Sequence, residues 1–151
     1  METPNCYSEM RTACRLGKPV LVVRLEEGSG NIVAIASNNA YCQFARASAY
    51  AAMKAGLVKM VRSIGLEMSK YGIRVNAIAP GWTDTGAARL DAKESTYYKI
   101  PLRRWVQPEE VGQTVLFFDS PAAASITGVT LVMDVGEQLL SDKGEKYGFE
   151  K

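Results

Sequence analysis

Short β-rich runs alternate with longer helical runs from residue 30 onward, and this alternation limits the fold of the chain more than any other feature. Parallel neighbouring strands need a long connection between them, which is usually a helix. The runs that predict strands are 31–36 (NIVAIA), 73–79 (IRVNAIA) and 130–134 (TLVMD), and those that predict helices are 48–70 and 108–119. The pattern therefore predicts an α/β fold, with a parallel sheet and flanking helices.

Residues 48–70 form the strongest helix candidate, because they are rich in residues with high helix propensity. Apolar residues recur there at spacings of three and four, which favours one buried face. Three of them, Leu57, Met60 and Ile64, fit either the core or a subunit interface. Gly72 is well placed as the left-handed residue that ends the helix.

The remaining segments are less regular. Residues 31–36 are almost wholly apolar, as expected of a central strand that is covered on both faces. Residues 18–25 (KPVLVVRL) contain enough valine and leucine for a strand, but their neighbours are ambiguous and the assignment stays open. Residues 81–106 have no firm period and are predicted to form a loop with one helical piece at most.

The composition argues against several classes of function. The 151 residues include no histidine, the commonest general base near neutral pH, so proton chemistry needs another residue type and no metal site is predicted. The three cysteines lack the spacing of zinc or redox motifs and are interpreted as thiols in a reducing compartment. A net charge of +2 without a basic block predicts no nucleic-acid partner.

No segment predicts membrane association or export. The apolar runs are far shorter than the roughly 18 residues that a membrane span needs. The first ten residues have neither the basic start nor the apolar stretch of a signal peptide. We therefore expect a cytoplasmic protein with no membrane partner.

Tyr50 and Lys54 are the first candidates for chemistry, because a spacing of four near a helix start puts both side chains on one face. An ammonium within about 4 to 6 Å lowers the pKa of a tyrosine and makes its phenol usable as an acid and a base. The same spacing recurs in the tail at Tyr147 and Lys151, so it is not specific by itself. Ser37 distinguishes the first pair, because it ends the preceding strand, where strand end and helix start would converge. A hydroxyl there would hold a substrate oxygen while Tyr50 passes the proton.

Five segments in this order resemble the classical branch of the short-chain dehydrogenase/reductase family. The segments are GNIVAIAS (30–37), YAAMK (50–54), YGIRVNAIAPG (71–81), PLRRWVQPEEV (101–111) and ITGVTLVMDVG (126–136). The resemblance implies a doubly wound, Rossmann-like sheet. It also implies an oxidoreductase that interconverts an alcohol and a carbonyl with NAD or NADP.

The resemblance also implies roles for single residues. Ser37 would orient the substrate oxygen, Tyr50 would act as general acid and base, and Lys54 would lower the pKa of Tyr50 and bind the nicotinamide ribose. The residues that would contact the cofactor are Tyr50, Lys54, Pro80, Gly81, Thr83 and Thr85. The substrate loop would run from Gly86 to Arg104, with Trp82 near its root and Tyr97 within it.

One motif of the family has no counterpart. The glycine-rich phosphate turn, Thr-Gly-x-x-x-Gly-x-Gly, is not found, since Gly28, Ser29 and Gly30 precede a strand rather than open a helix. We therefore expect a partial doubly wound fold that lacks the amino-terminal, nucleotide-binding half. The expected division of the chain is an uncertain segment 1–27, the carboxy-terminal half of a family domain at 28–140, and a charged tail at 141–151.

Such a half-domain leaves an apolar edge on strand 31–36, which something must cover. Residues 18–25, another copy of the chain or a separate amino-terminal partner would each do so, and the sequence does not choose among them. We expect a homo-oligomer or pairing with a related subunit. Two functions stay open: an NAD(P)-dependent oxidoreductase that acts on a small-molecule alcohol or carbonyl, and a catalytically inactive, truncated family member that serves as an assembly or binding module.

Overall fold

The computed structural model of the chain describes residues 20–42, 45–86, 96–97 and 100–139. The strands in this part of the chain are β1 (Val20–Glu26), β2 (Ser29–Ile35), β3 (Ile73–Pro80) and β4 (Thr130–Met133). The α-helices are α2 (Ser48–Met68) and α4 (Pro108–Asp119). The short 3₁₀ helices are η1 (Asn38–Ala40), η2 (Ser69–Tyr71), η3 (Pro121–Ala123) and η4 (Glu137–Leu139). None of the helices in the described segments is long and apolar enough to cross a bilayer.

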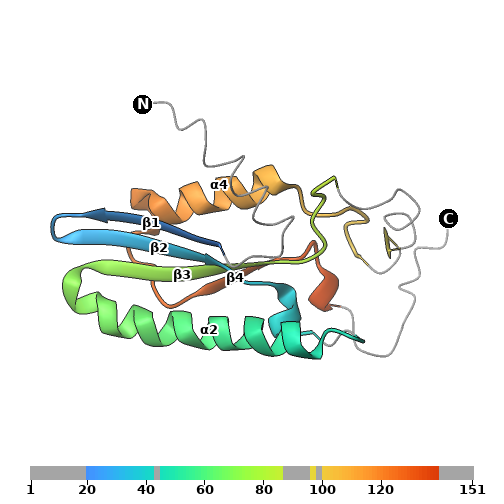
Figure 1. The fold of residues 1–151 in the computed structure, drawn as a ribbon. Helices are drawn as coiled ribbons and strands as arrows, with labels where there is room; N and C mark the ends of the chain where they lie inside the picture. The colour runs from blue at the N-terminus through green and yellow to red at the C-terminus, as the bar shows by residue number, and fades with distance from the viewer. Residues whose placement is uncertain (1–19, 43–44, 87–95, 98–99, 140–151) are drawn as a thin grey trace.

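The strands form one mixed sheet in the order β1-β2-β3-β4, with α4 on one face and α2 on the other (Figure 1). The α/β prediction is confirmed, and β2, β3 and β4 pair in parallel. β2 lies inside the sheet, as predicted for a strand that is covered on both faces.

The structure adds one antiparallel strand to the predicted parallel sheet. β1 pairs with β2 through a turn at Glu27 and Gly28, and Gly28 has a left-handed φ of 72°. A connection of two residues joins only antiparallel strands, so the short turn decides the direction of β1. The sequence left open three ways to cover the apolar edge of β2. In the structure, β1 of the same chain covers it.

Two apolar clusters lie on the two faces of the sheet, because successive strand residues point to opposite sides. On the α4 face, large side chains dominate, and the buried set is Val33, Ile35, Ile78, Val106, Val111, Val115, Phe118 and Ala123. On the α2 face, the strands present mostly alanine, and the buried set is Ala34, Ala36, Val61, Val75, Ala77 and Ala79. These small side chains let α2 pack closely on β3. This packing fixes the position of the first turns of α2 relative to the strand ends.

The element boundaries lie close to those predicted. α4 has the predicted bounds, with Pro108 in its first turn. α2 ends at Met68 and continues as η2, and Gly72 ends the helical segment with a left-handed φ of 69°. β2 begins at Ser29, two residues earlier than predicted, because Ser29 and Gly30 continue the pairing with β1. β4 ends at Met133, so Asp134 lies just beyond the strand.

Candidate functional site

The carboxyl ends of β2, β3 and β4 meet at one edge of the sheet, where ligands commonly bind in open α/β folds. Ser37 follows β2 and is 7% exposed. Its Oγ accepts hydrogen bonds from the backbone nitrogen of Asn39 at 3.2 Å and from the Asn39 amide at 3.4 Å. A hydroxyl has two acceptor positions and one donor, so these contacts leave the Ser37 O–H proton to donate.

Lys54 connects α2 to the end of β2. Its side chain is 9% exposed, and Nζ donates to the Ile35 carbonyl at 2.9 Å. Nζ also lies 5.6 Å from the centre of the Tyr50 ring, within the range of a cation–π contact. Tyr50 itself is 37% exposed. The ammonium therefore lies between the tyrosine and a carbonyl two residues before Ser37.

The structure thus brings the three predicted catalytic residues to adjacent segments at one end of the sheet. η1, which Ser37 caps, packs against α2. Within the described residues, the hydroxyls of Ser37 and Tyr50 share no hydrogen bond.

Pro80 ends β3, and Gly81 packs tightly against the segment that follows β4. Its nitrogen donates to the Met133 carbonyl at 3.0 Å. A Cβ at Gly81 would lie 2.8 Å from the Asp134 Cβ and 3.2 Å from the Asn38 amide nitrogen. The side of Gly81 where a side chain would stand is therefore filled by protein, and this close approach requires glycine.

Trp82, Thr83, Thr85 and Gly86 open the long segment after β3. The Thr83 hydroxyl donates to the Gly81 carbonyl at 3.0 Å, and the Thr85 nitrogen donates to the Thr83 carbonyl at 3.0 Å. The Gly86 nitrogen donates to the Asp84 carboxylate at 3.1 Å. These short-range bonds make a compact turn at the root of the predicted substrate loop.

The start of this segment, at Trp82 and Thr83, pairs with its end at Val106. Thr83 forms a β-bridge with Val106, and the Val106 nitrogen donates to the Trp82 carbonyl at 2.8 Å. Trp82 stacks on the buried Trp105 with ring centres 5.5 Å apart. Tyr97 is partly buried, and its carbonyl accepts from the Ile100 nitrogen. Residues 87–95 and 98–99 of the predicted substrate loop lie outside the described residues.

Glu137 is a polar residue of this edge that sequence reasoning missed. Its carboxylate accepts hydrogen bonds from the Asn38 amide at 2.7 Å and from the Trp82 indole at 3.1 Å. Burial raises the pKa of Glu137 above its ordinary value; the bonds from Asn38 and Trp82 oppose that rise, and the charge of Asp134 adds to it. Its place three residues after the predicted strand 130–134 was the available signal, since Ser37 and Gly81 follow the neighbouring strands.

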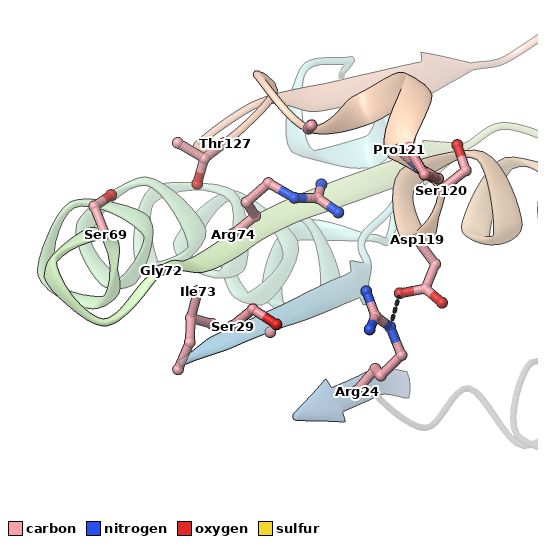
Figure 2. A pocket seen from close by; sticks show the side chains of 12 residues that line it. Arg24, Ser29, Ser69, Gly72, Ile73, Arg74, Asp119, Ser120, Pro121 and Thr127 are labelled. Atoms are coloured by element: carbon pink, nitrogen blue, oxygen red, sulfur yellow. Dashed lines mark hydrogen bonds and ion pairs between the residues drawn. The ribbon is translucent and has the colours of Figure 1, made fainter. Parts of the chain in front are cut away.

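Cavities lie at this end of the sheet and at the opposite end. A cavity of about 440 Å³ lies between η1 and α2 and is lined by residues that include Asn39, Cys42 and Ser48. A larger one of about 740 Å³ lies at the far end of the sheet (Figure 2). There Arg24 pairs with Asp119, and Arg74 donates to the Phe118 carbonyl. Both arginines of the larger cavity thus hold the end of α4.

Comparison with known proteins identifies the family. A family model described as enoyl-(acyl carrier protein) reductase matches residues 3–138. An oxidoreductase of the short-chain dehydrogenase/reductase family from Burkholderia thailandensis superposes with a TM-score of 0.70 at 31% identity, over 76% of this chain and 46% of that one. The chain belongs to the short-chain dehydrogenase/reductase family. The match begins at residue 3, so it also includes most of the segment 1–27 that the sequence left uncertain.

Other members of this family are similar over the same part. The acetoacetyl-CoA reductase of Synechocystis sp. is 40% identical over 76% of this chain and 49% of its own length. The 3-oxoacyl-[acyl-carrier-protein] reductase FabG of Vibrio harveyi is 33% identical over 81% of this chain and 51% of its own. Acetoin dehydrogenase YohF of Salmonella typhimurium superposes with a TM-score of 0.67 at 31% identity, over 76% of this chain and 45% of that one. The chain thus spans about half the length of the family members that it matches.

Proposed function

We propose that this chain carries the proton-transfer residues of a nicotinamide-dependent oxidoreductase that interconverts an alcohol and a carbonyl. The observation that carries the proposal is the buried ammonium of Lys54. It donates to the Ile35 carbonyl beside Ser37 and lies against the ring of Tyr50. A buried charge that is held beside a partly exposed phenol is typical of a site rather than of a solvated helix face.

The chemistry follows from these three side chains. In the reducing direction, Tyr50 would give its hydroxyl proton to the carbonyl oxygen of the substrate while a hydride adds to the carbonyl carbon. NADH or NADPH, when bound, supplies that hydride with its electron pair. Lys54 would stabilise the phenolate that remains, and Ser37 would donate its O–H to the substrate oxygen. General acid–base catalysis of this kind contributes roughly 10²- to 10⁴-fold to the rate.

Part of the predicted cofactor set fits a nicotinamide ribose. The ammonium of Lys54 is a hydrogen-bond donor that already donates to the Ile35 carbonyl, and ribose hydroxyls are acceptors that suit a donor of this kind. The other predicted cofactor contacts lie at and just after the end of β3 and would lie along the nicotinamide side. They are Pro80, Gly81, Thr83 and Thr85. The sequence does not discriminate NAD from NADP, so the proposal includes both.

The substrate class is proposed at the level of the reaction. Two of the relatives are named as reductases of acetoacetyl-CoA and of 3-oxoacyl-[acyl-carrier-protein]. We infer for this chain a small-molecule carbonyl or alcohol substrate that enters beside Trp82. A cytoplasmic location and assembly into a homo-oligomer, or with a related subunit, stay predictions.

A second candidate, a non-catalytic assembly or binding module, is favoured by a separate observation. Leu21, Val23 and Leu25 project from one face of β1, and each is more than half exposed. An apolar row of this kind on a strand at the sheet edge is suited to contact with another chain. This surface lies on a different element from Ser37, Tyr50 and Lys54.

Titration with NADH and NADPH, followed by nicotinamide fluorescence, tests the proposal. We expect saturable binding by the unmodified chain. Lys54→Met should weaken it by about 10- to 100-fold, because a charge-assisted hydrogen bond is lost. Lys59→Met, which removes an exposed lysine of the same helix, is the matched control and should leave binding unchanged. Linear, unsaturated signals at millimolar concentrations of both cofactors would reject the oxidoreductase and favour the module.

A further inference from the structure

A single carboxylate joins the three chain segments that follow the parallel strands. Asn38 follows β2, Trp82 follows β3 and Glu137 follows β4. Glu137 Oε2 accepts from the Asn38 amide at 2.7 Å, and Oε1 accepts from the Trp82 indole at 3.1 Å. The sequence separations are 99 and 55 residues. The contact therefore exists only in the assembled sheet.

The turn that carries Glu137 is fixed by its own hydrogen bonds. The Asp134 carboxylate accepts from the Gly136 nitrogen at 3.1 Å and from the Gln138 nitrogen at 2.8 Å. Val135, between Asp134 and Gly136, has a φ of 53°, a left-handed conformation that a β-branched residue rarely adopts. Such a conformation persists only where the surroundings determine it. The turn thus offers Glu137 as a fixed acceptor.

The two donors of Glu137 adjoin the parts of the site that must be held in place. Asn38 is 2% exposed and directly follows Ser37, in the 3₁₀ turn that Ser37 caps. Trp82 is 42% exposed, stacks on Trp105 and begins the predicted substrate loop. A group that binds both fixes the distance between the serine that would hold the substrate oxygen and the aromatic wall of the loop.

We propose that Glu137 is a positioning residue of the candidate active site, whose carboxylate holds Trp82 against the segment that carries Ser37. The role in positioning rests on the proposed function. In this role Glu137 would act only through Asn38 and Trp82.

The charge of Glu137 makes this contact dependent on pH. Burial raises the pKa of Glu137. The hydrogen bonds from Asn38 and Trp82, which lie on the other two segments, oppose that rise, and the charge of Asp134, on the same turn as Glu137, adds to it. The carboxylate therefore takes up a proton at a higher pH than an exposed glutamate does. Once protonated, one of its two oxygens becomes a hydroxyl and a weaker acceptor. We expect the hold on Trp82 to loosen as the pH falls through that raised pKa.

Tryptophan fluorescence with acrylamide quenching tests the contact without any cofactor. Glu137→Gln should raise the quenching of Trp82 by roughly twofold, because release of a side chain that is 42% exposed frees the rest of its surface. It should also remove the change of emission with pH that we expect of the unmodified chain above the ordinary pKa of glutamate. Trp82→Phe identifies the share of the signal that comes from Trp82, and Glu67→Gln, an exposed glutamate of α2, controls for the change of charge.

Exchanging the amide of position 38 and the carboxylate of position 137 provides the decisive control. Asn38→Asp alone sets two carboxylates against each other and should loosen Trp82 more than Glu137→Gln does. In the double variant Asn38→Asp with Glu137→Gln, the new amide donates to Asp and its oxygen accepts from Trp82. Its net charge equals that of the unmodified chain, so low quenching should return. In turnover assays, the single variants should raise KM for the carbonyl more than they lower kcat, and the double variant should restore KM.

The outcomes separate this inference from the proposed function. Unchanged quenching in both single variants, or high quenching that persists in the double variant, overturns the inference alone. If quenching behaves as expected but the unmodified chain binds neither NADH nor NADPH, the proposed function fails. The positioning role then fails with it, and only the structural contact remains.

Discussion

Lys54 is the residue on which the proposed chemistry depends. An ammonium loses its hydration when it is buried, and this costs several kcal/mol unless protein groups replace the water. Lys54 is 9% exposed, with the Ile35 carbonyl and the face of the Tyr50 ring beside its charge. Exposed positions were available on the same helix, since Lys59 is exposed. The burial of Lys54 thus separates it from the solvated face of the helix and supports its assignment to the proposed site.

At the same scale, Gly81 tests how tightly the strand ends are packed. Gly81→Ala should destabilise the fold by about 1–3 kcal/mol, because its Cβ would lie 2.8 Å from the Asp134 side chain and 2.9 Å from its Cα. Gly56→Ala is the matched control, since nothing lies within 4 Å of a Cβ there. In the middle of α2, that change should stabilise by about 0.5–1 kcal/mol. Chemical denaturation measures both, and equal effects of the two changes would contradict this packing.

At the scale of the element, the start of α4 shows how a loop and a helix stabilise each other. Glu110 accepts the Gln107 backbone N–H at 2.8 Å, which satisfies a donor at the helix start. The same carboxylate accepts two bonds from Arg104, at 2.7 and 2.8 Å. Arg104 and then the Gln107 N–H lower the pKa of Glu110 below its usual range. The charged carboxylate therefore ties the end of the predicted substrate loop to α4.

Glu110→Ala should accordingly destabilise the fold by about 1 kcal/mol at neutral pH, since a helix cap is lost. A lowered pKa in the folded state means that the contribution is present above the ordinary pKa of glutamate. It disappears as the pH falls through the lowered pKa. Thermal denaturation at neutral and acid pH measures the difference between variant and parent. Glu110→Gln keeps an acceptor without the charge and should show no acid dependence from this position. A destabilisation of Glu110→Ala that is the same at both pH values would argue against the charged cap.

At the scale of the whole molecule, the sequence predicted what local patterns determine. The alternation of runs predicted the elements, and the order of Ser37, Tyr50 and Lys54 on a strand end and a helix start predicted their meeting at one edge. Glu137 was missed, because its partners lie 99 and 55 residues away and only the sheet unites them. β1 was left open, because composition indicates a strand but not its neighbour. The tight packing of Gly81 on Asp134 likewise depends on strand register, which no local pattern contains.

The chain spans about half of its relatives, and its described part nevertheless contains a strand-end site with a buried ammonium. The exposed row Leu21, Val23 and Leu25 on β1 is the surface of the proposed assembly module, so the proposed activity and the proposed assembly call for separate tests. The proposed activity would depend on Tyr50, and a direct measurement tests this.

That measurement is the carbonyl-dependent oxidation of NADH and NADPH by the unmodified chain, Tyr50→Phe and Tyr71→Phe. Tyr71 is a matched control, because Lys70 Nζ lies 4.9 Å from its ring centre, in a pair like that of Lys54 and Tyr50. We predict that Tyr50→Phe lowers kcat by about 10²- to 10⁴-fold and that Tyr71→Phe leaves it unchanged. Equal turnover by the unmodified chain and Tyr50→Phe would contradict the assignment of Tyr50 as the proton donor.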